Sequence, residues 1–260
     1  MPELPDLQVF TRNLHARLAG RVVKGVKAWR ARRRNFTNRQ AAEALGGRTL
    51  NSIRREGKEA LFAFDNGRRL SMHLMLSGRF DLVGDPASVE FARLGIEFDG
   101  GEWLVVSDPD GWATFRLDSK PPTAPDALAD EFTADYLRAS LRRSSCVAVK
   151  AFLVDQRILR GIGNAYADEI LWASRIAPQS LCDRLPEEKA VELHAAIRTV
   201  LTDAIAQIER LAPEAVNGER RDFLKVHHPD RTHSPTGFPI RCETIGLKKT
   251  YYSDEQVVFL

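Results

Sequence analysis

The residues best suited to chemistry stand at the start of the chain, in Met1-Pro2-Glu3-Leu4-Pro5-Asp6. Pro2 is small enough for the initiator methionine to be removed, which would leave a free secondary amine beside the carboxyl group of Glu3. A terminal α-amine titrates at about 8, well below a lysine, so much of it is an unprotonated nucleophile near neutral pH. Such an amine can attack a sugar C1′ while the acid protonates the ring oxygen, giving a Schiff base. The alternative is that these residues only begin a helix.

A second candidate is the glycine-rich turn Arg160-Gly161-Ile162-Gly163-Asn164, which has a helical pattern on either side. Glycines allow close approach of another backbone, and Asn164 is well placed to cap the second helix. The turn would offer backbone amides and a helix N-terminus to a phosphate. The alternative is a plain helical hairpin with a glycine-rich turn.

The elements that must position these residues change character along the chain. A helix is predicted from about Pro5 to Leu18, and short strands with hairpin turns at Asn66-Gly67 and Gly100-Gly101 follow as far as about Leu117. Three prolines within residues 119–126 indicate a linker. Helical patterns then cover about 134–143, 147–157, 165–175 and 186–211, and strand-like texture returns from Phe223. The pattern predicts an α+β protein.

Composition excludes several classes of protein. Apolar residues make up 43% and charged residues 28% of the 260 residues, which is typical of a globular protein. No apolar run approaches the roughly 18–20 residues that span a bilayer, and the start lacks the features of a signal peptide. The three cysteines are too widely spaced for a CxxC metal site. A balance of 38 basic against 35 acidic residues permits a polyanionic partner without demanding one.

Five motifs stand in one order: PELPD at the start, REGK (Arg55–Lys58), HLMLSG (His73–Gly78), DEFTADYL (Asp130–Leu137) and VDQRILRGIGNAYADEIL (Val154–Leu171). Together they resemble the formamidopyrimidine-DNA glycosylase/endonuclease VIII family of base-excision-repair enzymes, and the resemblance covers essentially the whole chain. It implies an N-terminal helix with an antiparallel β-sandwich, then a helix-two-turns-helix domain with a C-terminal β-hairpin finger. The expected ranges are 1–118, a linker at 119–127, 128–222 and 223–260, with DNA in the cleft between the domains.

The resemblance also implies roles for individual residues. Pro2 would be the Schiff-base nucleophile, Glu3 the acid that opens the deoxyribose ring, and Lys58 a ligand of the phosphate beside the lesion. Asn164, with Gly163, would hold another phosphate. The family removes a damaged base and then eliminates both flanking phosphates, and extrusion of the nucleotide costs least at a damaged pair.

For the other charged groups, the sequence predicts structural or solvent-exposed roles. Asp168 and Glu169 are expected at a helix surface or cap rather than in catalysis. The basic run Arg30, Arg32, Arg33 and Arg34 is expected to be a solvated face, with contact to a DNA backbone as the alternative.

The chain departs from the family pattern in its finger. Typical members hold zinc with two CxxC pairs, and the aligned positions here are His233, Thr236, Ser253 and Gln256. Only the histidine is a credible ligand and a tetrahedral site needs four, so the resemblance implies a zincless finger with no cofactor. Strand pairing with Phe238, Ile240 and Tyr251 would then replace the stabilisation by the metal.

The hairpin arginine of typical members aligns with Lys248, followed by Lys249. A lysine carries the same charge as an arginine but cannot form two parallel hydrogen bonds to one phosphate. We expect Lys248 and Lys249 to contact phosphate.

The residues that fill the void left by the flipped nucleotide differ too. Leu76 stands where methionine is usual, Asp110 where arginine is usual, and Trp112 where phenylalanine is usual. A carboxylate cannot donate to the orphan base, so the opposite-base preference is open. The segment APEAVNGERRD before Phe223 is shorter than the loop that caps 8-oxoguanine in the purine-specific branch, so that specificity is not assumed.

These observations predict a bifunctional DNA glycosylase/AP lyase with a proline nucleophile, acting on damaged bases or abasic sites. The alternative is a DNA-damage-binding protein with weak or no base excision, suggested by Asp110 and the altered finger. A third hypothesis, a glycosylase for bulky or crosslinked adducts, follows from the uncapped pocket. Retention of Pro2, Glu3 and Lys58 favours an enzyme. We expect a monomer with damaged DNA as its partner and no membrane association, located in the cytoplasm at the nucleoid.

Overall fold

A computed structural model of the chain describes residues 1–245 and 247–260. The residues form two compact units. The first consists of Met1–Pro121 and Ile208–Glu219, and the second of Pro122–Gln207 and Arg220–Leu260. None of the described helices is both long and apolar enough to cross a bilayer. The predicted domain ranges stay a prediction.

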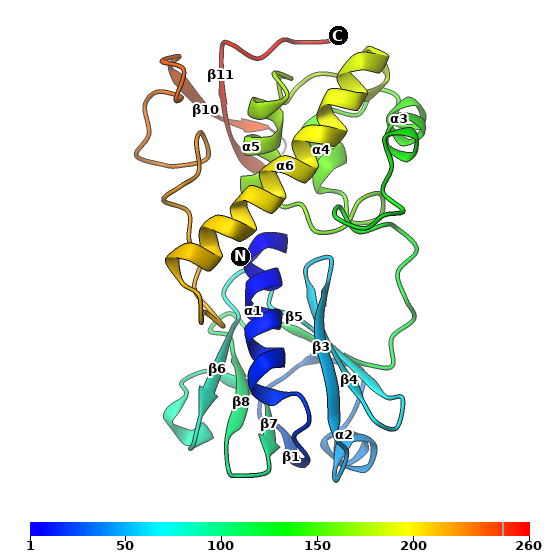
Figure 1. Cartoon of the computed structure of the whole chain (residues 1–260), viewed down its shortest axis with the longest axis vertical. Coiled ribbons are helices and arrows are strands. Elements are labelled where there is room, and N and C mark those ends of the chain that lie inside the picture. Colours follow the sequence, from blue (N-terminus) through cyan, green and yellow to red (C-terminus); the bar gives the residue numbers. More distant parts are fainter. Residues whose placement is uncertain (246) are drawn as a thin grey trace. The chain divides into compact units, whose positions relative to one another are not determined.

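The first unit is a β-sandwich with a leading helix (Figure 1). One sheet has the strand order β1-β7-β8-β6 and the other β2-β9-β5-β4-β3. All strand pairs are antiparallel except β2 with β9. The elements are α1 (Leu4–Leu18), β1 (Val23–Ala28), β2 (Arg33–Arg34), α2 (Asn38–Leu45), β3 (Leu50–Glu56), β4 (Glu59–Phe64), β5 (Arg69–His73), β6 (Arg79–Val83), β7 (Ala92–Phe98), β8 (Trp103–Ser107) and β9 (Thr114–Leu117).

One hydrophobic core joins the two sheets and the helix. Phe62 of β4 and Phe80 of β6 meet edge to face with their ring centroids 6.4 Å apart. Leu7, Phe10 and Leu14 of α1 belong to the same buried cluster, which confirms the apolar face expected of this helix. Because residues from both sheets contribute to it, the core holds the strands that carry the turns in place.

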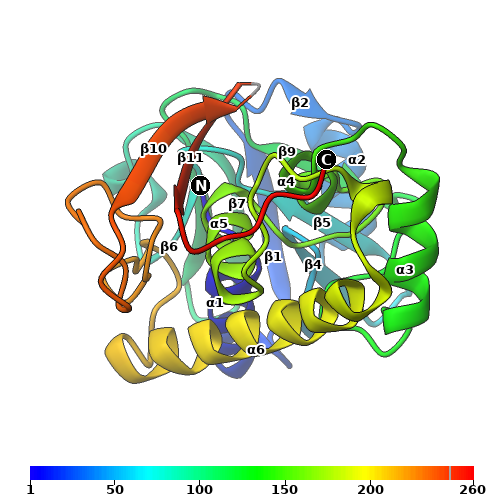
Figure 2. The same ribbon diagram turned by 90° about the horizontal axis from the view of Figure 1, so that it is seen from above.

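The second unit is helical and ends in a β-hairpin. Its elements are α3 (Ala134–Arg143), α4 (Val149–Val154), α5 (Asn164–Ala173), α6 (Glu187–Leu211), β10 (Ile240–Ile245) and β11 (Lys248–Ser253), with the hairpin strands side by side in Figure 2. The Thr133 hydroxyl accepts a hydrogen bond from the Tyr136 amide and caps α3 as expected. The helix expected over 147–157 is shorter, because the Asp155 carboxylate accepts from the Arg157 amide and forms a turn instead.

Candidate functional site

The N-terminal end of α1 lies at the turn between β3 and β4. The Gln8 Oε1 accepts a hydrogen bond from Arg55 Nε at 2.9 Å, and the His15 Nδ1 accepts one from the Ile53 amide at 3.2 Å. The helix α1 and the strand β3 therefore run in opposite directions, and the first residues of α1 lie beside the end of β3. This direction brings the first residues of the chain to the segment that carries Lys58.

The predicted catalytic residues are buried in this unit. Pro2 is buried, Glu3 is 3% exposed and Lys58 is 8% exposed. The Glu3 amide donates to Asp6 Oδ2 at 2.9 Å, which fixes the first turn of α1 and completes the helix start predicted from Pro5 and Asp6. The Met1 amine contacts the carboxylate of Glu219, which belongs to the same unit. Ionisable groups held out of water at a helix start are suited to proton transfer.

His73 is a polar residue of this region to which the sequence analysis gave no role. Its Nδ1 accepts a hydrogen bond from the Met75 amide at 2.9 Å, so the neutral ring carries its proton on Nε2. Burial, and then the nearby positive charge of Lys58, lower the pKa of His73 to about 4. A neutral imidazole N–H beside an ammonium group is a pair of donors for one anion. The signal was its place in the HLMLSG motif.

Two turns carry the predicted void-filling residues. Leu76 is 62% exposed and Trp112 is 45% exposed, as side chains that enter a base stack must be. The side chain of Asp110, in contrast, is hydrogen-bonded within the protein. Its Oδ2 accepts from the Ser77 hydroxyl at 2.7 Å, and the same hydroxyl lies 2.6 Å from Asp108 Oδ1. Ser77 thus joins the two turns, and the carboxylate of Asp110 is held by them.

In the second unit, the predicted cap of α5 is wrong. Gly163 occupies the N-cap position, and Asn164 is the first helical residue. The Asn164 amide group instead donates from Nδ2 to the Lys249 carbonyl of the hairpin at 2.8 Å. Gly161 adopts a φ of 108°, which glycine tolerates, and its amide donates to Gln156 Oε1 at 2.9 Å. The two-turn segment is therefore tied to the finger through Asn164.

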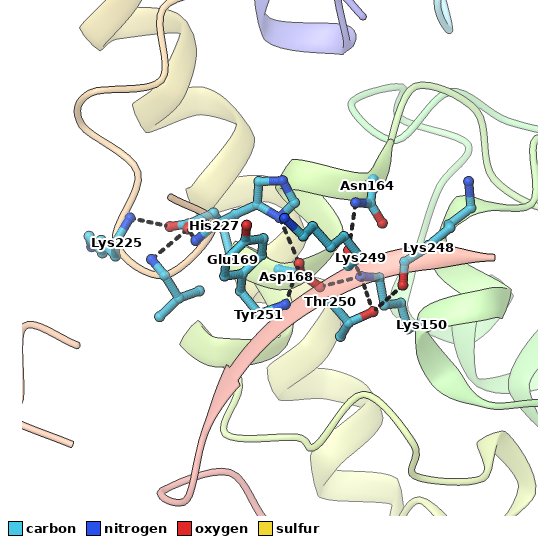
Figure 3. A network of polar contacts seen from close by, with 11 residues as sticks. Lys150, Asn164, Asp168, Glu169, Lys225, His227, Lys248, Lys249, Thr250 and Tyr251 are labelled. Carbon is cyan, nitrogen blue, oxygen red and sulfur yellow. Dashed lines mark hydrogen bonds and ion pairs between the residues drawn. The ribbon is translucent and has the colours of Figure 1, made fainter. Parts of the chain in front are cut away.

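A buried ion pair strengthens that connection (Figure 3). Lys150 Nζ lies 2.7 Å from Asp168 Oδ1, and both side chains are almost completely buried. Lys150 also donates to Thr250 Oγ1 and to the Lys249 carbonyl, at 2.7 and 3.2 Å. The second Asp168 oxygen accepts from the Tyr251 amide at 2.9 Å. Because a buried charge must be paired, this network fixes the backbone of β11 at the two lysines.

Glu169 is the next residue along α5 and is likewise buried. It accepts hydrogen bonds from three successive backbone amides, those of residues 225–227, each at 2.8 Å. Burial raises the pKa of Glu169, and the three amides oppose that rise by stabilising its charged form. The expectation that Asp168 and Glu169 lie at a helix surface or cap is therefore wrong. Both carboxylates organise the chain around α5.

Lys248 and Lys249 are exposed at the start of β11. Among the residues that the structure describes, neither ammonium group has a carboxylate partner within an ion-pair distance. Two unpaired cations on a backbone held by Lys150 and Asn164 are suited to contact with phosphate.

The aligned zinc-ligand positions do not fit a metal. Thr236 Oγ1 and Ser253 Oγ both donate to the carboxylate of Glu255, at 2.7 and 2.9 Å, and Arg175 forms an ion pair with the same group. The Gln256 side chain is committed to the Ser253 amide and the Ile176 carbonyl. Within the described part of the chain, no group of three or more His, Cys, Asp or Glu residues is arranged to hold a metal ion. Glu255 therefore joins the two ends of the finger through hydrogen bonds.

The fold and these residues define a helix-two-turns-helix protein with a β-sandwich unit, and the comparisons agree. Residues 1–115 match the family model of the formamidopyrimidine-DNA glycosylase N-terminal domain, and residues 123–212 that of the formamidopyrimidine-DNA glycosylase H2TH domain. The chain is 31% identical over 269 residues to the formamidopyrimidine-DNA glycosylase of Herpetosiphon aurantiacus, covering 96% of this chain and 97% of that protein. It is 34% identical over 217 residues to that of Chloroflexus aggregans, covering 79% and 78%.

Solved structures show the same architecture. The complex between the Lactococcus lactis Fpg and an abasic site containing DNA matches with a TM-score of 0.86 and 25% identity, over 97% of this chain and 98% of that one. The chain belongs to the formamidopyrimidine-DNA glycosylase family.

Proposed function

We propose that this protein is a base-excision-repair DNA glycosylase with AP lyase activity, in which Pro2 is the nucleophile. Family membership, with models that match residues 1–115 and 123–212 and with Pro2 and Glu3 present at the start of α1, is the observation that carries the proposal. The solved complex with an abasic site containing DNA supports damaged DNA as the substrate. Removal of Met1 would free the Pro2 amine.

The chemistry follows from an amine and an acid at one helix start. The Pro2 nitrogen bonds to C1′ of the deoxyribose, and the base leaves with the electron pair of the glycosidic bond and takes up a proton. Glu3 protonates the ring oxygen, which opens the sugar and forms the Schiff base. Loss of a C2′ proton then expels the 3′ phosphate, and a second elimination expels the 5′ phosphate. Lys58 would bind the phosphate beside the lesion, with the His73 Nε2–H as a second donor.

The second unit would hold the backbone with Gly163, Asn164, Lys248 and Lys249. An amide group has two donor hydrogens, so Asn164 can bind phosphate while it keeps its bond to Lys249. Leu76 and Trp112 would fill the void after base extrusion, with Asp110 held by Ser77.

We further propose that the protein works without zinc, as a monomer, at the nucleoid in the cytoplasm. The committed side chains around Glu255 support the first of these statements.

Borohydride trapping on a duplex with one abasic site tests the proposal. The intact protein should form a covalent adduct that peptide mapping assigns to Pro2, after mass spectrometry has confirmed the loss of Met1. Glu3→Gln should slow base excision by about 10²–10⁴-fold, the usual contribution of a general acid, and Pro2→Gly should reduce trapping.

Glu43→Gln is the matched control, because Glu43 is an exposed carboxylate on α2 paired only with the exposed Arg39 among the described contacts. If the intact protein binds the abasic site tightly, has a confirmed Pro2 terminus and yet forms no adduct, the lyase proposal is wrong. The damage-binding alternative then stands.

A further inference from the structure

A crevice lies at the β2 edge of the five-stranded sheet. It has a volume of about 310 Å³ and is lined by residues 32–35 on one side and 114–116 of β9 on the other. Four of these seven residues are arginines: Arg32, Arg33, Arg34 and Arg116. The face of the sheet on which these arginines lie decides which ligand they can bind.

The strand register places Arg33 and Arg116 on the outer face of the sheet. Arg33 pairs with Thr114, and Arg116 lies two residues further along β9, so these three share one face. Phe115, between them, is fully buried in the core and points to the other face. The same face extends from the edge strand toward the middle of the sheet, because Thr114 of β9 pairs with His73 of β5. A single cross-strand row therefore runs from His73 through Thr114 to Arg33.

Most of the charge in the crevice is uncompensated. Arg34 is engaged, since its guanidinium donates to Asn38 Oδ1 at 2.9 Å and lies over the Phe36 ring. Within the described residues, no carboxylate pairs with Arg32, Arg33 or Arg116. The acid at the end of β9, Asp118, is paired with Arg68. Three guanidinium groups close together without counter-charge repel one another unless an anion binds among them.

Arg33 is also held in place by the loop that carries the predicted void-filling residues. Its guanidinium carbon lies 4.1 Å from the centre of the Trp112 ring. Stacking of this kind orders the guanidinium while its edge donors stay available to an acceptor. The crevice is thereby joined to the loop in which Asp110 stands in place of the family's arginine.

We propose that Arg32, Arg33 and Arg116 form a binding site for the phosphodiester backbone of DNA. The proposal rests on the proposed function, because it assumes that DNA lies along the face that carries His73. Arg33 and His73 are two strand spacings apart, about 10 Å, and one DNA strand presents about three phosphates over that length. Arg32, Arg33 and Arg116 place three cations around one open crevice, and successive phosphates of a strand can supply an anion to each of them, which a single small anion cannot do. The site contributes affinity that is independent of base sequence.

The salt dependence of binding tests this site. A fluorescein-labelled duplex with one tetrahydrofuran abasic analogue is titrated at several KCl concentrations, and the slope of log K against log salt is compared between variants. Each phosphate contact contributes about 0.9 to the magnitude of that slope. Arg32→Gln and Arg116→Gln should each lower the magnitude by about 0.9 and weaken binding to damaged and undamaged duplex alike. Arg33→Lys should keep the slope, because it keeps the charge.

The control is Arg39→Gln, an equally conservative change at an exposed arginine that is already paired with Glu43 on α2. Its slope should equal that of the unmodified protein. Unchanged slopes and affinities for both Arg32→Gln and Arg116→Gln would overturn the inference. Borohydride trapping by the unmodified protein reports separately on the proposed function, so failure of the crevice and failure of the lyase chemistry give different results.

Discussion

At the scale of single residues, His73 shows how two neighbours set the state of a third. Its Nδ1 is committed to the Met75 amide, which leaves Nε2–H as the only donor of the neutral ring. Burial and the charge of Lys58 keep the ring neutral at physiological pH. The residue can thus donate a hydrogen bond beside a lysine without adding a second buried charge. The same arrangement lowers the free energy of unfolding at acidic pH.

We predict that His73 makes the protein less stable as the pH falls. Between pH 6.5 and about 4 the unfolded chain binds a proton at this residue and the folded chain does not, so the free energy of unfolding decreases as the pH is lowered. His73→Gln removes this term while the amide oxygen can still accept from Met75. Urea unfolding at about pH 7.5 and about pH 5 should show a smaller loss for the variant, by at most about 2 kcal/mol. Equal losses in both proteins would contradict the prediction.

At the scale of elements, two acidic clusters connect the finger to itself and to α5. Asp168 and Glu169 of α5 fix β11 and residues 225–227 respectively. Glu255 ties the two ends of the finger together through Thr236 and Ser253, and its ion pair with Arg175 connects them to the chain after α5. The carboxylate of Glu255 therefore links groups on both sides of the finger by accepting from each of them.

We predict that Glu255→Gln destabilises the protein by about 2 kcal/mol, since it leaves a half-exposed arginine and two hydroxyls without their anionic acceptor. Urea unfolding measures the loss. Asp254→Asn is the matched control, because Asp254 is the adjacent carboxylate and its pair with Arg241 is exposed on both sides. That change should cost less than about 1 kcal/mol.

Treatment with a metal chelator should leave the melting temperature of the unmodified protein unchanged. A lowered melting temperature, or stoichiometric zinc in the purified protein, would show that the finger depends on metal after all.

Local signals account for the elements that were predicted correctly. The Asn66-Gly67 turn between β4 and β5 and the Thr133 cap of α3 depend on neighbours within a few residues, so the sequence reveals them. Asp168 was misjudged because its partner Tyr251 is 83 residues away. The same holds for Asn164, whose acceptor is 85 residues away in a different element. Polar contacts across such separations leave no periodic pattern in the sequence.

At the scale of the whole molecule, the chain passes between its two units more than once. Residues 208–219, which follow most of α6, belong to the first unit. The Asn13 amide group donates to the carbonyls of Pro213 and Ala215, at 2.9 and 2.8 Å, and Asn217 donates to the Phe80 carbonyl at 2.7 Å. A segment far along the chain therefore completes the unit that carries Pro2 and Lys58.

We predict that Asn13→Ala loosens this segment within the full chain. The variant loses the two hydrogen bonds that Asn13 donates and the two that it accepts from Arg12, while the Pro213 carbonyl keeps Arg12 as a donor. The free energy of unfolding should therefore fall by about 1–2 kcal/mol. Amide hydrogen exchange in residues 212–219 should rise, while that of β10 and β11 in the other unit should not. Exchange in 212–219 that matches the unmodified protein would mean that the Asn217 hydrogen bond and the apolar packing of Ala215 and Val216 anchor the segment without Asn13.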